Sequence, residues 1–105
     1  MSFKVTLSER LPGFPLPVKF TLPNGVEAKM VFTVKALKSS ELQATYKDAE
    51  NKTGAEFVKS LATGWELDDE FNDENINELV DRYPAVVGSL ISAYTQALAG
   101  YRVKN

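Results

Sequence analysis

Apolar and polar residues alternate along much of the first third of the chain, which is the two-residue period of strands with one buried face. Alternating runs occupy residues 2–7, 18–22 and 26–36, and each run predicts a strand. Pro23-Asn24-Gly25 separates the last two runs. Asn-Gly in this position indicates a tight hairpin because both residues tolerate positive φ. Residues 8–17 hold three prolines and a glycine, so we expect a loop there.

After residue 38 the apolar residues recur at three- and four-residue spacing, which is the period of amphipathic helices. Ser40-Glu41-Leu42-Gln43 predicts a capping box at the start of a first helix. The polar stretch 47–54 is expected to end or bend this helix. A second predicted helix carries apolar side chains at Phe57, Val58, Leu61 and Trp65. Gly64 is placed to end that second helix.

Residues 71–84 predict a capped helix followed by a corner. Asn72 is the expected N-cap, whose side chain accepts a backbone hydrogen bond from the first turn. Phe71 and Ile76 have the spacing of a hydrophobic staple. Pro84 disfavours helical geometry at Tyr83 and lacks an N–H, yet proline suits the first turn of a new helix. Tyr83-Pro84 is therefore predicted to join two helices.

The last predicted helix carries almost no charge, since none of the nineteen residues between Arg82 and Arg102 is charged. Its expected apolar face comprises Val87, Leu90, Ile91, Tyr94, Ala97, Leu98 and Tyr101. A membrane span needs about 20 mostly apolar residues, and the proline, glycine and hydroxyl residues of this run argue against one. A central core helix and a helix that forms part of an oligomer interface both fit the pattern.

Together these elements predict an α+β fold. An N-terminal antiparallel β-hairpin or three-stranded sheet is expected to be packed by three or four C-terminal α-helices. The chain length suits one compact domain over residues 1–105, with a β-rich part at 1–37 and a helical part at 38–105.

The composition disfavours an enzyme. The chain has no cysteine and no histidine, which removes thiolate metal sites, the commonest general base and the commonest zinc ligand. We expect no cofactor. An enzyme that uses Asp or Glu as acid and base stays open, and it would need two carboxylates in one cleft whose pKa values are pushed apart.

Charge is divided unevenly along the chain. The net charge is −2, but residues 1–65 carry nine basic and six acidic side chains, whereas residues 66–105 carry three basic and eight acidic ones. Scattered lysines in an acidic chain disfavour a nucleic-acid binder, which needs clustered positive charge. No apolar signal segment follows Met1, so the cytoplasm is the expected compartment.

The acidic segment that begins at Asp68 does not predict a calcium site. An EF-hand loop that started there would need glycine at its sixth position and glutamate at its twelfth. The chain has Asp73 and Leu79 at these positions. We expect no metal site, and we interpret the segment as a solvated loop whose charges complement the dipole of the next helix.

Six side chains are candidates for contact with a partner. Tryptophan and tyrosine have a large apolar body and a polar group, which suits both cores and interfaces. The uncharged last helix adds two aliphatic candidates. The expected partner-binding residues are Trp65, Tyr83, Leu90, Ile91, Tyr94 and Tyr101. Packing in the core is the alternative for each of them.

Several short motifs occur together in the second half of the chain. They are Ala55-Glu56-Phe57-Val58-Lys59-Ser60-Leu61 before Gly64-Trp65-Glu66, the Phe71-Asn72 start with Glu74 and Ile76, the Leu79…Tyr83-Pro84 corner, Ala93-Tyr94…Leu98, and the ending Gly100-Tyr101-Arg102-Val103-Lys104-Asn105. With these motifs the chain resembles the tail assembly chaperones of long-tailed bacteriophages and prophages, best over residues 55–105.

The resemblance implies a non-enzymatic chaperone that binds the tape-measure protein, keeps it soluble and helps recruit tail-tube subunits. It implies as partners the tape-measure protein, the major tail (tube) protein, further copies of the chain in a homo-oligomer, and a longer form made by ribosomal frameshifting. No nucleic acid or membrane is expected among them. It also implies a location in the host bacterial cytoplasm and absence from the mature virion. The alternative is a small structural or adaptor subunit that the tail retains.

Overall fold

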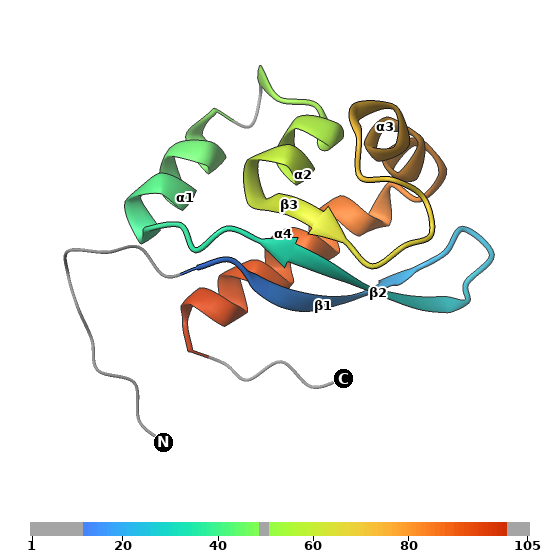
Figure 1. Ribbon diagram of the computed structural model, residues 1–105, viewed down its shortest axis with the longest axis horizontal. Helices are drawn as coiled ribbons and strands as arrows, with labels where there is room; N and C mark the ends of the chain where they lie inside the picture. The colour runs from blue at the N-terminus through green and yellow to red at the C-terminus, as the bar shows by residue number, and fades with distance from the viewer. Residues whose placement is uncertain (1–11, 49–50, 101–105) are drawn as a thin grey trace.

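A three-stranded sheet and a set of helices make up the computed structural model, which describes residues 12–48 and 51–100 (Figure 1). The elements in chain order are β1 (Phe14–Thr21), β2 (Glu27–Val34), α1 (Ser39–Lys47), α2 (Gly54–Leu61), β3 (Ala62–Trp65), α3 (Asp73–Arg82) and α4 (Ala85–Leu98). The strands are antiparallel in the order β1-β2-β3. The predicted α+β fold with a three-stranded antiparallel sheet is therefore confirmed.

The β1–β2 hairpin forms as its turn residues predict. Gly25 has a φ of 87°, in the left-handed region that favours glycine. The Asn24 side chain accepts a hydrogen bond from the Val26 N–H at 3.0 Å, and the Leu22 N–H donates to the Val26 carbonyl at 2.8 Å. Phe20 lies opposite Ala28 in the resulting register, so the even-numbered residues of both strands share one face.

β1 begins at Phe14, so part of the predicted loop 8–17 is a strand. The prolines in it are tolerated because β1 lies at the edge of the sheet. The Leu22 N–H donates to the carbonyl of Val26, just before β2. By alternation, the even-numbered residues of β1 turn their N–H and C=O groups toward β2, and the odd-numbered residues turn theirs away. Pro15 and Pro17 thus occupy positions where the ladder needs no N–H. The loop prediction was wrong for this part because proline interrupts a central strand but is tolerated in an edge strand, and the sequence does not show which strand lies at the edge.

The third strand is β3, whereas the predicted strand 2–7 lies outside the described residues. β3 follows α2 directly, in a segment where Gly64 was predicted to end a helix. Gly64 instead lies opposite Thr33, and Trp65 lies opposite Phe32. The prediction of a longer second helix was wrong because this segment gains its backbone hydrogen bonds from β2, which is distant in the sequence. Helical spacing alone carries no information about such pairing.

Helix starts were predicted more accurately than the third strand. Asn72 caps α3 by accepting a hydrogen bond from the Asn75 N–H at 2.8 Å. Tyr83 ends α3, and Pro84 begins the turn into α4 with a φ of −59°. At α1 the N-cap is Lys38 and not Ser40. The Glu41 carboxylate accepts a hydrogen bond from the Lys38 N–H at 2.7 Å, so the helix begins before the predicted cap.

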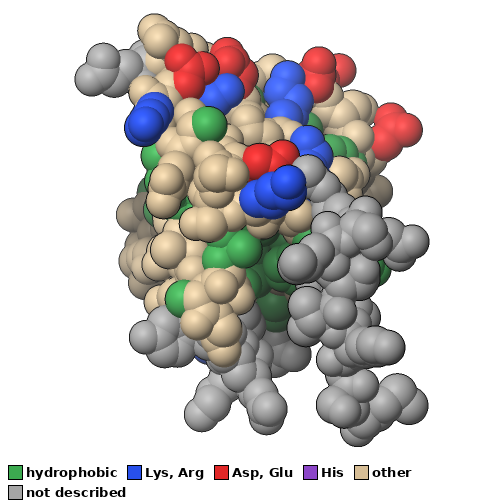
Figure 2. Space-filling model, turned by 90° about the vertical axis from the view of Figure 1, so that its left-hand side faces the viewer, with side chains coloured by type: hydrophobic (Ala, Val, Ile, Leu, Met, Phe, Trp, Pro, Cys, Tyr) green, Lys and Arg blue, Asp and Glu red, His purple; other side chains and the backbone are tan. Residues whose placement is uncertain are grey.

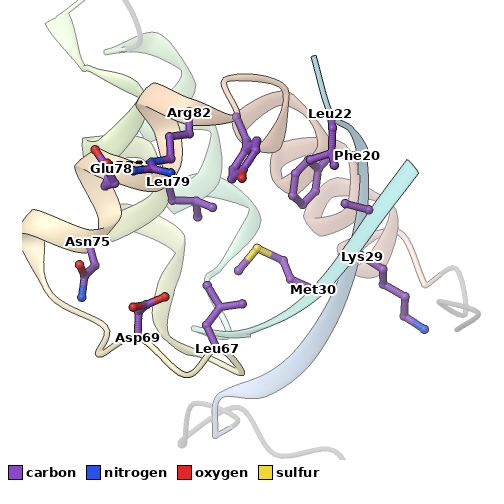
Figure 3. A pocket seen from close by; sticks show the side chains of 12 residues that line it. Phe20, Leu22, Lys29, Met30, Leu67, Asp69, Asn75, Glu78, Leu79 and Arg82 are labelled. Atoms are coloured by element: carbon purple, nitrogen blue, oxygen red, sulfur yellow. Dashed lines mark hydrogen bonds and ion pairs between the residues drawn. The ribbon is translucent and has the colours of Figure 1, made fainter. Parts of the chain in front are cut away.

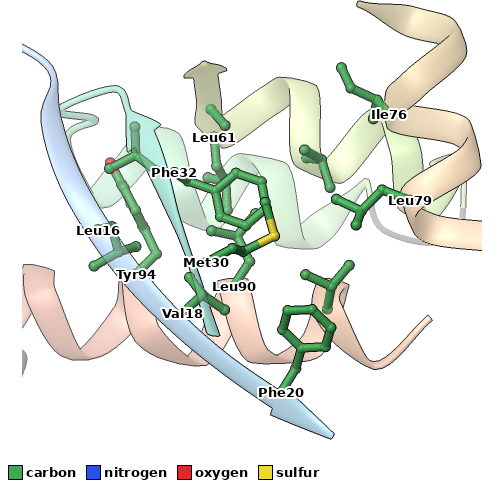
Figure 4. Close-up of a cluster of buried hydrophobic side chains, with 14 of the residues drawn as sticks. Leu16, Val18, Phe20, Met30, Phe32, Leu61, Ile76, Leu79, Leu90 and Tyr94 are labelled. Carbon is green, nitrogen blue, oxygen red and sulfur yellow. The ribbon is translucent and has the colours of Figure 1, made fainter. Parts of the chain in front are cut away.

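One face of the sheet and the helices enclose a continuous apolar core (Figure 4). The buried side chains are Leu16, Val18 and Phe20 from β1, Met30, Phe32 and Val34 from β2, Ala62 from β3, and Leu42, Ala55, Phe57, Val58, Leu61, Ile76, Leu79, Val86, Leu90 and Tyr94 from the helices. Burying one such side chain stabilises the fold by about 1.5–3 kcal/mol. The face of α4 that packs inward includes Val86, which was not predicted, while Leu98 stays exposed.

Candidate partner-binding groove

An open groove of about 590 Å³ lies where the hairpin, the 66–70 loop and α3 meet (Figure 3). We call it the α3 groove. Its lining residues are Phe20, Leu22, Ala28, Lys29, Met30, Leu67, Asp69, Asn75, Glu78, Leu79, Arg82 and Tyr83. Most of these side chains are apolar, and the polar ones come mainly from α3 and the loop. A largely apolar concavity with a few polar groups is the usual character of a binding site.

The hairpin supplies one wall of the α3 groove. Strand alternation places Phe20 and Leu22 of β1 on the same face as Ala28 and Met30 of β2. Phe20 and Met30 are buried, whereas Leu22 and Ala28 nearer the turn are only partly buried. The end of the hairpin projects past the helices (Figure 1), and its apolar face is therefore incompletely covered there.

α3 supplies the opposite wall. Asn75, Glu78, Leu79 and Arg82 recur at three- and four-residue spacing and so lie on one face of the helix. Arg82 Nε donates to Glu78 Oε1 at 2.8 Å. This hydrogen bond and the charge of Glu78 raise the pKa of Arg82. Leu79 is the apolar side chain that α3 contributes to the groove.

Trp65 holds the loop that closes the third side. Its indole N–H donates to the Asp69 backbone carbonyl at 2.8 Å. Its ring lies 5.0 Å from the Phe71 ring at 85° and 6.4 Å from the Phe32 ring at 60°. These edge-on contacts anchor both ends of the loop on the core. The loop in turn presents Leu67, which remains 40% exposed.

Of the six predicted partner-binding residues, Tyr83 lines the α3 groove and Trp65 supports the loop beside it. Tyr83 lines the α3 groove, and its ring lies 6.2 Å from the Phe20 ring. Trp65 is partly buried beneath the loop and supports it from behind. Tyr83 is thus part of the lining of the groove, whereas Trp65 acts on the groove only through the loop that it holds in place.

The other predicted residues lie elsewhere. Leu90 and Tyr94 are 0% exposed and belong to the core, so neither presents a side chain to a partner in this conformation. The Tyr94 hydroxyl donates to the Lys35 carbonyl and accepts a hydrogen bond from the Leu37 N–H at 2.9 Å. Ile91 packs partly buried against the core. Tyr101 lies outside the described residues.

Most of the groove was not anticipated from the sequence. The alternation in the hairpin indicated that Phe20, Leu22, Ala28 and Met30 share a face, and this was the one available signal. It could not indicate which part of that face the helices leave uncovered. Leu67 stood out only as an isolated apolar residue in an acidic segment.

The end of the molecule that carries α1 has a different surface. Figure 2 shows charged side chains gathered in the upper part of this face and hydrophobic side chains lower down. This face supports no assignment of a site.

Residues 12–48 and 51–100 contain neither a metal-binding cluster nor a membrane-spanning helix. No group of three or more acidic side chains gathers there in a way that could hold a metal ion. None of the helices in these ranges combines the length and apolar content that crossing a membrane requires.

Comparison with known proteins identifies one family. The family model described as phage tail assembly chaperone matches residues 1–105, the whole chain. No curated protein and no solved structure matches the chain.

Proposed function

The chain belongs to the family of phage tail assembly chaperones, and we propose that it binds the tape-measure protein through the α3 groove and keeps that protein soluble during tail assembly. The family itself supports a chaperone role in assembly and points to a non-enzymatic protein. The choice of client and of binding surface is our proposal.

The observation that carries this proposal is the open apolar lining of the groove. Leu67 is one of three large hydrophobic side chains that stand exposed within the described residues, and it lies on the groove. The partly buried side chains of Leu22 and Tyr83 line the same groove. Removing apolar surface of this kind from water stabilises the complex with a partner.

The groove suits the side chains of an amphipathic helix. Helix-in-groove recognition inserts apolar residues at i, i+3 or i+4, and i+7 into a hydrophobic depression. A volume of about 590 Å³ receives several such side chains. It does not enclose a whole helix, whose diameter is about 10–12 Å. The client would therefore lie across the opening between the hairpin and α3, with its polar face in solvent.

Further parts of the proposed role rest on family membership. We place the chain in the host bacterial cytoplasm and outside the finished virion, because a chaperone leaves its client once assembly is complete. Recruitment of the major tail (tube) protein and self-association into a homo-oligomer belong to the same proposal. The exposed face of α4 is one surface on which copies could meet, since residues 85–98 carry no charge.

Co-expression with the tape-measure protein tests the proposal. The expected result is a soluble complex that elutes as one species in size-exclusion chromatography with light scattering, with several copies of this chain per client. Expression of the tape-measure protein alone, or with an unrelated acidic protein of similar size, is the control and should leave it insoluble. An insoluble client in both cases would refute the proposal. Recovery of this chain from purified virions would favour a retained structural subunit.

A further inference from the structure

The charged side chains around the α3 groove differ in whether they have partners. Arg82 is hydrogen-bonded to Glu78 on the same helix, so these two charges offset one another. Lys29 extends from β2 away from the opening (Figure 3). Asp69 lies at the open end, with its carboxylate turned toward the groove between Asn75 and Leu67 (Figure 3). No ion pair within residues 12–48 and 51–100 involves the Asp69 side chain.

Asp69 supports the fold through its backbone rather than through its carboxylate. Its carbonyl accepts the hydrogen bond from the Trp65 indole at 2.8 Å, and this bond holds the loop in place. The side chain is exposed. The carboxylate is thus available at the mouth of an apolar groove without being required for the shape of the loop.

We propose that the α3 groove selects helical segments that carry a lysine or arginine beside their apolar stripe, and that Asp69 contacts this basic residue. The inference rests on the proposed function, because it specifies the client segment that the groove accepts. A helix that lies across the opening places its apolar residues on Leu67 and Tyr83. The residues that flank this stripe then lie over the rim, within reach of Asp69.

The surrounding charges favour the same client. The loop carries Glu66, Asp68 and Glu70 next to Asp69, and all four residues are exposed. Their combined negative potential attracts basic segments and repels acidic ones, so it raises the association rate and sets the specificity more than the affinity. A single rim contact of this kind changes the dissociation constant by about 2- to 5-fold. The effect is screened by salt, because the Debye length falls to about 3 Å at 1 M.

Three labelled peptides test the inference with the intact chain. Each is an amphipathic helix with the same leucine stripe, and the flanking positions are all lysine, all glutamine or all glutamate. We expect fluorescence anisotropy to give the order lysine, glutamine, glutamate from tightest to weakest at low salt, with the differences shrinking at high salt. Equal affinities for the three peptides would overturn the inference while leaving groove binding intact. Failure of every peptide to bind would overturn both the inference and the helix-in-groove mode.

Asp69 variants assign the preference to one side chain. Asp69→Asn should reduce the preference for the lysine peptide by about 2- to 5-fold, and Asp69→Lys should abolish or reverse it. Asp68→Asn is the matched control, because it removes the same charge from the same loop at a residue that does not line the groove. Unchanged preference in the Asp69 variants, or an equal loss in Asp68→Asn, would overturn the role of Asp69. Binding of the tape-measure protein, measured in parallel, reports separately on the proposed function.

Discussion

The hydroxyl of Tyr94 on α4 donates a hydrogen bond to the backbone carbonyl of Lys35, which directly follows β2. The same hydroxyl accepts a hydrogen bond from the Leu37 N–H at 2.9 Å. The Tyr94 ring is fully buried and stacks on Phe14 of β1, with ring centres 6.3 Å apart. One side chain therefore connects the last helix to β1 and to the segment that follows β2, and it serves the fold rather than a partner.

Tyr94→Phe should destabilise the protein by about 1–3 kcal/mol, because the partly buried carbonyl of Lys35 and N–H of Leu37 lose their partner. Urea denaturation measures this loss. Tyr46→Phe is the matched control, since the Tyr46 hydroxyl bonds at 2.7 Å to the exposed hydroxyl of Thr95. We expect the control to lose less than about 1 kcal/mol, because water can replace that bond. Equal losses in the two variants would contradict the assigned role of Tyr94.

Gly54 and Gly88 should respond to alanine in opposite directions. A Cβ at Gly54 would lie 2.7 Å from Cγ1 of Val80 and 3.1 Å from Cγ2 of Val87, so α2 would be pushed away from α3 and α4. Gly54→Ala should cost about 1–3 kcal/mol. Gly88 lies at the end of the first turn of α4, and a Cβ there would meet nothing within 4 Å, so Gly88→Ala should stabilise the protein by about 0.5–1 kcal/mol. Thermal and urea unfolding of both variants test the packing of α2 against α3 and α4. A stabilised Gly54→Ala would show that this packing leaves room for a methyl group.

Within residues 12–48 and 51–100 no strand pairs with the outer edge of β1, and Pro15 and Pro17 should protect this edge from pairing with other chains. An edge strand offers unpaired N–H and C=O groups, and proline removes the N–H. Replacing both prolines with threonine restores two outward N–H groups and should increase association above that of the wild type. Light scattering over a range of concentrations measures this change. Pro23→Thr, in the turn, is the control. Identical association in all three proteins would show that the edge is protected in another way.

Locally encoded features of this fold could be predicted from the sequence. Asn24-Gly25 specifies the hairpin turn, Asn72 specifies the start of α3, and Tyr83-Pro84 specifies the corner, because each acts through residues within one turn of itself. β3 could not be predicted, because Ala62–Trp65 is a strand only through its pairing with β2.

The candidate site depended even more on tertiary structure. Tyr83 was predicted because tyrosines are common at interfaces, but Leu90 and Tyr94 appeared equally suitable and are buried. The sequence shows that these residues are apolar, while only the packing of α4 on β1 decides which of them remain accessible. Leu67 and Asp69 belong to the site because the Trp65 indole fixes their loop, and this contact has no signature in the sequence.

Binding of the tape-measure protein to two leucine variants tests the central claim most directly. Leu67→Asp places a charge in the α3 groove, and Leu98→Asp makes the same change on α4, away from the groove; the two leucines are 40% and 39% exposed. Both variants should therefore fold with similar melting temperatures. We predict that Leu67→Asp weakens the complex by about 10-fold or more, because the exposed apolar surface of the leucine no longer contributes and a carboxylate in an apolar contact costs further free energy, and that Leu98→Asp binds as the wild type does. Normal binding by Leu67→Asp, or an equal loss in Leu98→Asp, would contradict the assignment of the α3 groove as the client-binding site.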